Sequence, residues 1–367
     1  MWETLEERDL LYSLVCLPGI GRQTIRAIYE YWGSFHAFAA DWSGGKDMPM
    51  LPGKQAERIL REQWTFRKVL QDKSARTESF FTMWDPEYPA LFRHIPDPPL
   101  LLFYRGEVSL LQQPMVAVVG SRRPTPYGKS ACAQLVGDMV TAGITIVSGL
   151  ALGIDAEAHR TALRLGGNTI AVLGCGIDQV YPAIHRPLYR QIAEQGLILS
   201  EYPPGTAPRQ GLFPERNRLI SGLAQGVLVV EAAERSGSLI TADFALEQGR
   251  EVFAVPGPIF SPLSRGPHNL IKQGAKLVTG WEEIREELFP LLGMSARMEP
   301  MPMSPGLSAS DAASKVLDRI AYEPVHWDEL YASLCGVERQ RLDQELLQLE
   351  IRGLICSLPG GYYVRQR

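Results

Sequence analysis

Short apolar runs alternate with helical segments through the middle of this 367-residue chain, and this alternation constrains its fold more than any other feature. The runs lie at Met115–Val119, Ile144–Val147, Thr169–Leu173, Leu197–Ser200, Val227–Val230 and Glu251–Val255. Helices are expected between most of them, at Tyr127–Ala142, Ile154–Leu165, Arg186–Glu194, Glu215–Leu223 and Leu239–Gln248. Apolar runs without polar alternation are typical of parallel strands buried on both faces. The sequence therefore predicts an α/β fold with a doubly wound, mostly parallel, Rossmann-like sheet.

The segment before this region, residues 1–75, looks helical. One helix is expected over Glu3–Cys16 and a second over Arg22–Trp32, joined by the sequence LPGIG. A glycine hairpin followed by a helix resembles a helix-hairpin-helix motif, which brings backbone N–H groups close to a phosphate. An ordinary corner between two helices explains the same pattern equally well. A weaker echo, Leu51-Pro52-Gly53, precedes a helical pattern at Lys54–Leu70.

The alternating region spans about residues 80–290. The segment after it has two parts. Residues 291–310 are rich in Met, Pro and Ser, which is the composition of a linker. In residues 311–367, helical patterns at Asp311–Ala321, Trp327–Leu334 and Val337–Arg352 are followed by a hairpin at 354–365. This order is typical of a winged helix. Acidic residues outnumber basic ones there, which favours a protein-contact or accessory module over one that binds nucleic acid.

Composition excludes several classes of protein. The 37 basic and 41 acidic residues give a formal charge of −4, which excludes a uniformly basic nucleic-acid coat but leaves room for a local basic groove. The five cysteines form no CxxC pair, which argues against a disulfide framework and a zinc site. No signal peptide is apparent, and no apolar run approaches the roughly 18 residues of a membrane helix. We therefore expect a cytoplasmic protein without metal or membrane segment.

The loop after the first apolar run, Gly120-Ser121-Arg122-Arg123, has the residue types of an anion site. In a doubly wound sheet, ligands bind beyond the carboxyl ends of the strands. A glycine lets the backbone approach an anion, the serine can donate a hydrogen bond, and the arginines add charge-assisted contacts. The loop lacks GxGxxG, so a dinucleotide cofactor is disfavoured and no cofactor is expected. A tight turn with solvated arginines is the alternative.

Two further loops combine small residues with the start of a helix. Gly149 and Gly153 suit close approach of a phosphate to the backbone, and Asp155 can cap the helix that follows. Asp155 and His159 have a spacing that could support acid–base chemistry, although a cap and a hydrogen-bonded core histidine explain them more simply. Gly237 and Ser238 lie in the other small-residue loop, also ahead of a helix.

An aromatic residue beside arginines indicates single-stranded nucleic acid. Phe213 is followed by Arg216, Asn217 and Arg218 and preceded by Arg209. Bases stack on an exposed ring, at about 1–3 kcal/mol each, while cations track the phosphates. A surface turn with a half-buried phenylalanine is the alternative.

No catalytic nucleophile stands out. Cys175 has no histidine placed beside it in sequence, and there is no Walker A lysine and no HExxH. The chain is therefore predicted not to be an enzyme. The alternative is a nucleotide-processing enzyme similar to the phosphoribohydrolases, with Glu231 or Glu234 as acid and Arg122 as phosphate anchor. The PGGxGTxxE run of that group is absent.

Taken together, several colinear segments of residues 80–290 resemble the DprA family, also called Smf. The segments are GSRRPTPYG, VSGLALGIDAEAH, IAVLGCGID, FPERNRLISGL, VVEAAERSGSLITADFALEQGREVFAVPG and NLIKQGAKL. The resemblance implies an extended Rossmann fold, with a sterile-alpha-motif-like helical domain before it and a winged helix after it. It implies a protein of natural transformation and competence, which binds single-stranded DNA without sequence preference and loads the RecA recombinase.

The resemblance also implies roles for particular residues. Gly120, Ser121 and Arg122 would hold a phosphate, and Phe213 would stack a base. Arg216 and Arg218 would neutralise the DNA backbone, and Asn217 would order the loop through hydrogen bonds to main chain. The family tends to carry a basic residue just before the phenylalanine, where this chain has Gln210 and, one residue earlier, Arg209. A homodimer, RecA and a single-strand-binding protein are the implied protein partners. The implied dimer and RecA surface comprises His268, Ile271, Lys272 and Leu277.

Overall fold

The computed structural model describes residues 6–17, 20–43, 78–290, 316–320, 324–334, 339–351, 354–358 and 360–365. The Leu51-Pro52-Gly53 hairpin, the expected Lys54–Leu70 helix and the 291–310 linker lie outside these ranges, as do Pro18 and Gly19 and most of the expected Asp311–Ala321 helix.

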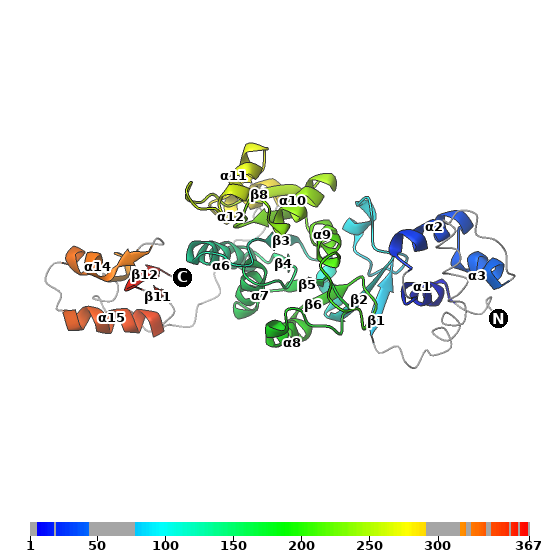
Figure 1. Cartoon of the computed structure of the whole chain (residues 1–367), viewed down its shortest axis with the longest axis horizontal. Helices are drawn as coiled ribbons and strands as arrows, with labels where there is room; N and C mark the ends of the chain where they lie inside the picture. Colours follow the sequence, from blue (N-terminus) through cyan, green and yellow to red (C-terminus); the bar gives the residue numbers. More distant parts are fainter. Residues whose placement is uncertain are drawn as a thin grey trace.

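A nine-stranded sheet forms the centre of the molecule, in the order β1-β2-β6-β5-β4-β3-β7-β8-β9 (Figure 1). The seven neighbouring strands β6-β5-β4-β3-β7-β8-β9 pair in parallel, whereas β1 and β2 add an antiparallel edge. The strands are β1 (Ser79–Thr82), β2 (Leu101–Gly106), β3 (Met115–Val119), β4 (Thr145–Ser148), β5 (Thr169–Leu173), β6 (Leu197–Ser200), β7 (Gly226–Val229), β8 (Glu251–Ala254) and β9 (Lys276–Leu277). The predicted α/β class and mostly parallel sheet are confirmed.

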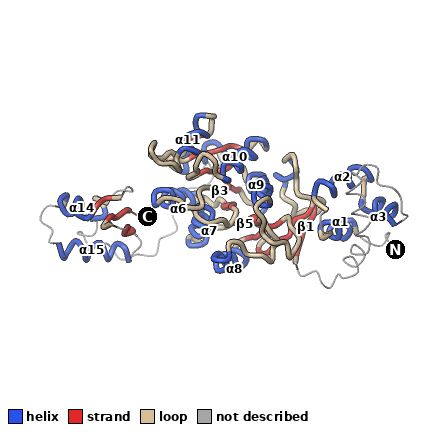
Figure 2. Tube along the Cα trace, viewed as in Figure 1, coloured by secondary structure: helices blue, strands red, loops and turns tan. Residues whose placement is uncertain are grey.

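Helices cover both faces of the sheet (Figure 2). α6, α7, α8 and α12 pack on one face, and α9, α10 and α11 pack on the other. Their bounds are α6 (Pro126–Thr141), α7 (Ile154–Arg164), α8 (Arg186–Gln195), α9 (Leu212–Leu223), α10 (Gly237–Glu247), α11 (Arg265–Lys272) and α12 (Trp281–Leu288). Burial from both sides explains why the strands read as continuous apolar runs.

The order of the strands places a switch point at β3. The chain moves outward from β3 through β4, β5 and β6, then returns to the other side of β3 as β7. A crevice opens at the carboxyl ends of the strands where such an order reverses. The loops after β3 and β7 meet there, because Ser121 N donates to Glu231 O at 2.6 Å.

An N-terminal helical module packs on the antiparallel edge of the sheet. It contains α1 (Glu7–Val15), α2 (Arg22–Trp32) and α3 (Phe35–Ser43). The Tyr12 ring lies 5.0 Å from the ring of Phe80 and 6.0 Å from that of Phe103, centroid to centroid. The module and the sheet edge therefore share one apolar core.

Several short elements near the C-terminus form the winged helix. They are β10 (Val325–His326), α14 (Trp327–Ser333), α15 (Arg339–Ile351), β11 (Ile355–Leu358) and β12 (Tyr362–Arg365). The winged helix has a small core of its own, to which one face of α15 contributes Leu342, Leu346 and Leu349. The sequence pattern did not predict the strand β10. Within the described ranges, no helix combines the length and the apolar character that crossing a membrane requires.

Candidate nucleic-acid interface

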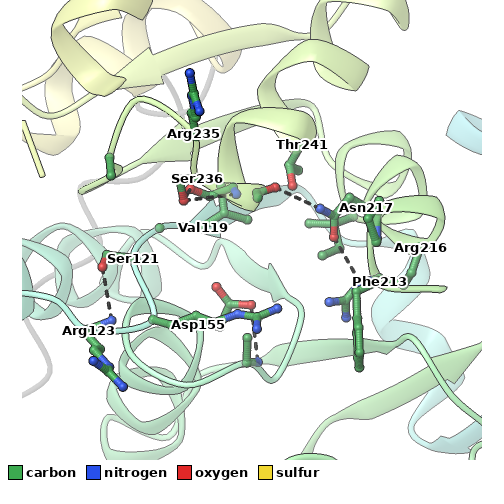
Figure 3. Close-up of a pocket in the computed structure, with 18 of the residues that line it drawn as sticks. Val119, Ser121, Arg123, Asp155, Phe213, Arg216, Asn217, Arg235, Ser236 and Thr241 are labelled. Carbon is green, nitrogen blue, oxygen red and sulfur yellow. Dashed lines mark hydrogen bonds between the residues drawn. The ribbon is translucent and has the colours of Figure 1, made fainter. Parts of the chain in front are cut away.

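A groove of about 850 Å³ opens at the switch point, beyond the carboxyl ends of β3, β4 and β7 (Figure 3). Its walls come from the loops after β3, β4, β5, β6, β7 and β8 and from residues of α9 and α10. The lining includes Gly120, Ser121, Arg122, Arg123, Ala151, Asp155, Tyr181, Gln210, Phe213, Arg216, Asn217, Arg235, Gly237 and Ser238. Segments that are distant in sequence thus meet at one site.

The loop after β3 forms the floor and one rim of the groove. A Cβ atom on Gly120 would lie 2.7 Å from Ile154 Cγ1, so a side chain there would displace Ile154, the first residue of α7. Ser121 Oγ accepts from Arg123 N at 3.1 Å, which holds the turn. Arg122 and Arg123 are exposed, and no ion pair is recorded for either in the described part of the chain. Their guanidinium groups remain available to an anion.

Arg216 occupies a different place from the one the sequence suggests. It is only 4% exposed, and its Nη1 donates to Gly149 O at 2.8 Å and to Val172 O. Burial lowers its pKa, although the charge of Asp155 opposes that shift. A Cβ on Gly149 would lie 2.6 Å from Arg216 Nη2, so this glycine makes room for the guanidinium. The expectation that Arg216 neutralises DNA phosphates is corrected: the side chain ties the ends of β4 and β5 to α9.

Asp155 accompanies Arg216 at the base of the groove (Figure 3). Its carboxylate accepts from Gly149 N at 3.1 Å and from Ala151 N at 3.4 Å. Burial raises its pKa, and the charge of Arg216 acts in the opposite direction. Asp155 therefore holds the preceding loop through hydrogen bonds to its main chain. It is not the N-cap of α7, because that residue is Gly153.

His159 does not form an acid–base pair with Asp155. The ring is fully buried, and its Nδ1 lies 2.7 Å from Thr169 Oγ1. Burial lowers the pKa of His159 to about 3, so the ring is neutral at physiological pH. The simpler reading, a core histidine bonded to its neighbour, holds.

α9 begins at Leu212, three residues earlier than the sequence pattern predicted. A proline is tolerated in a first helical turn, because its missing N–H would have no helical partner there, so Pro214 does not delay the helix. Phe213 is consequently part of a helix and not of a surface turn. Its ring packs on Tyr181 at 5.2 Å, with 32° between the planes, and lies 6.0 Å from the Arg122 guanidinium.

Asn217 lies one turn after Phe213 on the same face of α9. Its Nδ2 donates to Gly237 O at 3.2 Å and so joins α9 to the loop after β7. We expected this side chain to hydrogen-bond main chain, and it does so across the groove. Ser236 caps α10 by accepting from Ser238 N, which leaves Gly237 exposed at the groove.

Arg218 and Arg209 lie outside the groove lining. Arg218 is 3% exposed and binds Glu201 through both carboxylate oxygens at 2.7 Å, and Asp97 at 3.0 Å. It therefore neutralises protein carboxylates, which corrects its expected role at the DNA backbone. Arg209 is exposed, but Gln210 is the residue that reaches the groove.

Among the lining residues that sequence reasoning missed are Arg235 and Tyr181. Arg235 is exposed at the rim opposite Arg123 (Figure 3). It follows β7, and its place at the carboxyl end of a central strand was a usable signal. Tyr181 gave no such signal, because its contact with the Phe213 ring depends on a loop after β5 whose path only the fold defines.

The acids considered for the enzymatic alternative are engaged elsewhere. Glu231 is 3% exposed, and its carboxylate accepts from Thr125 N at 2.8 Å and Thr125 Oγ1 at 2.5 Å. Glu234 is exposed, and its Oε1 lies 3.7 Å from Arg265 Nη1. Neither belongs to the groove lining. In the described residues, no cluster of three His, Cys, Asp or Glu side chains could hold a metal ion.

The residues expected at a partner surface lie on α11 and on β9, the last strand of the sheet. Leu277 is 44% exposed on that edge, and Lys272 is exposed at the end of α11. Ile271 is half-buried, and His268 Nε2 lies 3.0 Å from Gly257 O.

Two family models match the chain. The model described as DNA recombination-mediator protein A matches residues 79–289, and that of the DprA winged helix domain matches residues 299–361. The chain belongs to the DNA recombination-mediator protein A family. It is 37% identical to the Smf protein of Synechocystis, over 85% of this chain and 87% of that relative. It is 44% identical to the Escherichia coli Smf protein, over 75% of this chain and 74% of the relative.

Solved structures of the family agree with the fold. The X-ray structure of DNA processing protein A from Streptococcus pneumoniae is similar with a TM-score of 0.63 and 39% identity, covering 77% of this chain and 98% of the other. A structure concerned with the single-stranded DNA binding mode of the Helicobacter pylori protein gives a TM-score of 0.53 and 34% identity, covering 58% and 96%. The chain thus has the role of a DNA-processing recombination mediator.

Proposed function

We propose that the groove binds single-stranded DNA without sequence preference, and that the protein loads RecA onto this DNA during natural transformation. The observation that carries the proposal is that exposed Arg122 lies in one groove with the Phe213 and Tyr181 rings, which pack on each other at a tilt. The Helicobacter pylori relative, whose structure concerns single-stranded DNA, supports it.

The chemistry of the groove fits a single strand better than a duplex. Unpaired bases expose π-faces that can stack on aromatic rings, whereas the bases of a duplex are already stacked on each other. Arg122, Arg123 and Arg235 line the same groove and can contact successive phosphates. Main-chain N–H groups and arginines bind the strand through its backbone, which carries no sequence information.

We assign protein partners to the β9 edge. An exposed edge strand with an apolar side chain, here Leu277, favours association with another chain. A homodimer through α11 and β9, with RecA and a single-strand-binding protein as further partners, follows this assignment. No catalytic step is part of the proposal.

The test compares fluorescent oligo-dT with the matching duplex at two salt concentrations, for the wild type, Arg122→Ala and Phe213→Ala. We expect preference for the single strand, a salt slope lower by about 0.7 in Arg122→Ala, and about 1–3 kcal/mol weaker binding in Phe213→Ala. Arg164→Ala is the matched control, because Arg164 is exposed at the far end of α7. Equal affinity for duplex and single strand, or unchanged binding in both groove variants, would contradict the proposal.

The loading step needs a separate assay. RecA filament formation on DNA covered with single-strand-binding protein should accelerate when the wild type is added, and Arg122→Ala should accelerate it less. A wild type that binds DNA but has no effect on RecA would restrict the function to DNA binding.

A further inference from the structure

The N-terminal module touches the groove helix α9 on the side that faces away from the groove. Phe213 and Asn217 point to the groove, whereas Glu215 and Arg218 lie on the other face of the same helix. Arg22, the first residue of α2, lies against that second face, with its Nη1 2.6 Å from Glu215 Oε2. A residue far from the groove in sequence therefore contacts the helix that carries the stacking ring.

Arg22 belongs to a network of ion pairs, which we call the α2–α9 clasp. Asp97 lies at its centre, with Arg22 Nε at 2.7 Å, Arg218 Nε at 3.0 Å and Arg26 Nη2 at 3.1 Å. Arg218 also binds Glu201 at 2.7 Å. The clasp thus consists of Arg22, Arg26, Asp97, Glu201, Glu215 and Arg218.

Charges in the α2–α9 clasp balance, with three arginines against three carboxylates. Partial burial raises the pKa of Asp97, but the charges of Arg218 and Arg22 outweigh it and leave that pKa below its usual value. Asp97 is therefore ionised at neutral pH. Without Arg22, the network would carry one uncompensated negative charge, shared by Asp97 and Glu215.

That negative charge would lie close to the bound strand. Glu215 is two residues from Phe213 but on the other face of α9, so about one helix diameter, roughly 10 Å, separates its carboxylate from the groove. Its side chain is 46% exposed, so its field reaches the solvent around the groove. Charges interact over about 8–10 Å at physiological ionic strength, so an unneutralised Glu215 would repel the phosphates next to the stacked base.

We propose that Arg22 is a positioning residue of the DNA-binding groove, which neutralises Glu215 and Asp97 so that α9 can accept a phosphate backbone. The inference rests on the proposed function, because it concerns the same groove and the same ligand. Arg22, the first residue of α2, thus contacts carboxylates of the sheet domain.

The test measures oligo-dT affinity at two salt concentrations for Arg22→Ala, Glu215→Gln and the double variant. Arg22→Ala should bind about two- to fivefold more weakly at low salt, with a smaller difference at high salt. Glu215→Gln should bind at least as tightly as the wild type, since it removes a negative charge, and the double variant should recover wild-type affinity. Arg8→Ala is the matched control, because Arg8 joins the same module to the sheet edge through Phe80 O at 3.3 Å and Asp85 at 4.0 Å.

The outcomes separate this inference from its alternatives. If Arg22 only holds the domains together, Glu215→Gln will weaken binding as Arg22→Ala does, and the proposal is wrong. Equal losses in Arg8→Ala and Arg22→Ala would overturn it as well, as would wild-type affinity in Arg22→Ala. A wild type that binds no single-stranded DNA in the same titration defeats the proposed function and this inference together. Glu215→Gln keeps the test decisive should Arg22→Ala fold poorly.

Discussion

The arginines at the end of the sheet fall into two groups that differ in what surrounds them. Arg122, Arg123 and Arg235 lie on loops and are exposed, whereas Arg216 and Arg218 lie on α9 and are at most 4% exposed. The loop arginines leave their charge to a ligand. The arginines on α9 bind protein carbonyls and carboxylates, and so hold in place the helix that carries Phe213. Proximity to a groove therefore does not make an arginine a ligand contact.

The largest effect that would test this comparison is on stability. Arg216→Ala leaves Asp155 and two strand-end carbonyls without their buried partner, so we expect the free energy of unfolding to fall by about 3–5 kcal/mol. Urea unfolding measures it. Arg122→Ala, matched in chemistry but exposed, should change stability by about 0.5 kcal/mol or less. Similar losses in the two variants would remove the distinction between the groups.

Lowering the pH should reduce the free energy of unfolding through the buried His159. His159 has a folded-state pKa of about 3, below its value in the unfolded chain, so the unfolded state binds more protons between these two values. This contribution to stability is complete at neutral pH and is lost as pH falls below about 6.5, at up to about 1.4 kcal/mol per pH unit.

Unfolding of the wild type and of His159→Asn across pH 4–7 checks this effect, with the range set by the ordinary pKa of histidine at about 6.5. The asparagine variant should lack the histidine part of the slope. A wild-type slope that persists in this variant would place the titrating group elsewhere.

A smaller effect is expected for Arg235, which the sequence motifs did not single out. Arg235→Ala should weaken oligo-dT binding and lower the salt slope by about 0.7, with stability nearly unchanged. Titrations at several salt concentrations measure the slope. A normal slope would move the strand away from this rim of the groove.

The smallest effect is expected for Arg209, which the sequence favoured and the structure places outside the groove lining. Arg209→Ala should bind oligo-dT nearly as the wild type does, in contrast to Arg235→Ala. A loss in Arg209→Ala equal to that in Arg235→Ala would show that the DNA path extends past Gln210.

Much of the fold followed from local pattern. β3, β5 and β6 have the bounds that the apolar runs predicted, and α2 spans Arg22–Trp32 as expected. The start of α9 was missed because Pro214 reads as a helix breaker, although a first turn tolerates it. The glycine-arginine loop after β3 was found because its position depends only on the strand before it. Tyr181 and the α2–α9 clasp were not, since they depend on packing between distant segments.

The sequence by itself determined that this chain forms a parallel sheet with glycine-rich loops at its carboxyl end, because apolar runs and small residues act through local geometry. It also placed arginines and a phenylalanine near those loops. Only the tertiary structure decided which arginines are exposed in the groove and which are buried. Arg218 donates a hydrogen bond to Asp97, 121 residues away in sequence, and Arg216 donates one to Gly149 O, 67 residues away. Burial and pairing are properties of the contacts that the fold creates, so residue type and spacing alone do not specify them.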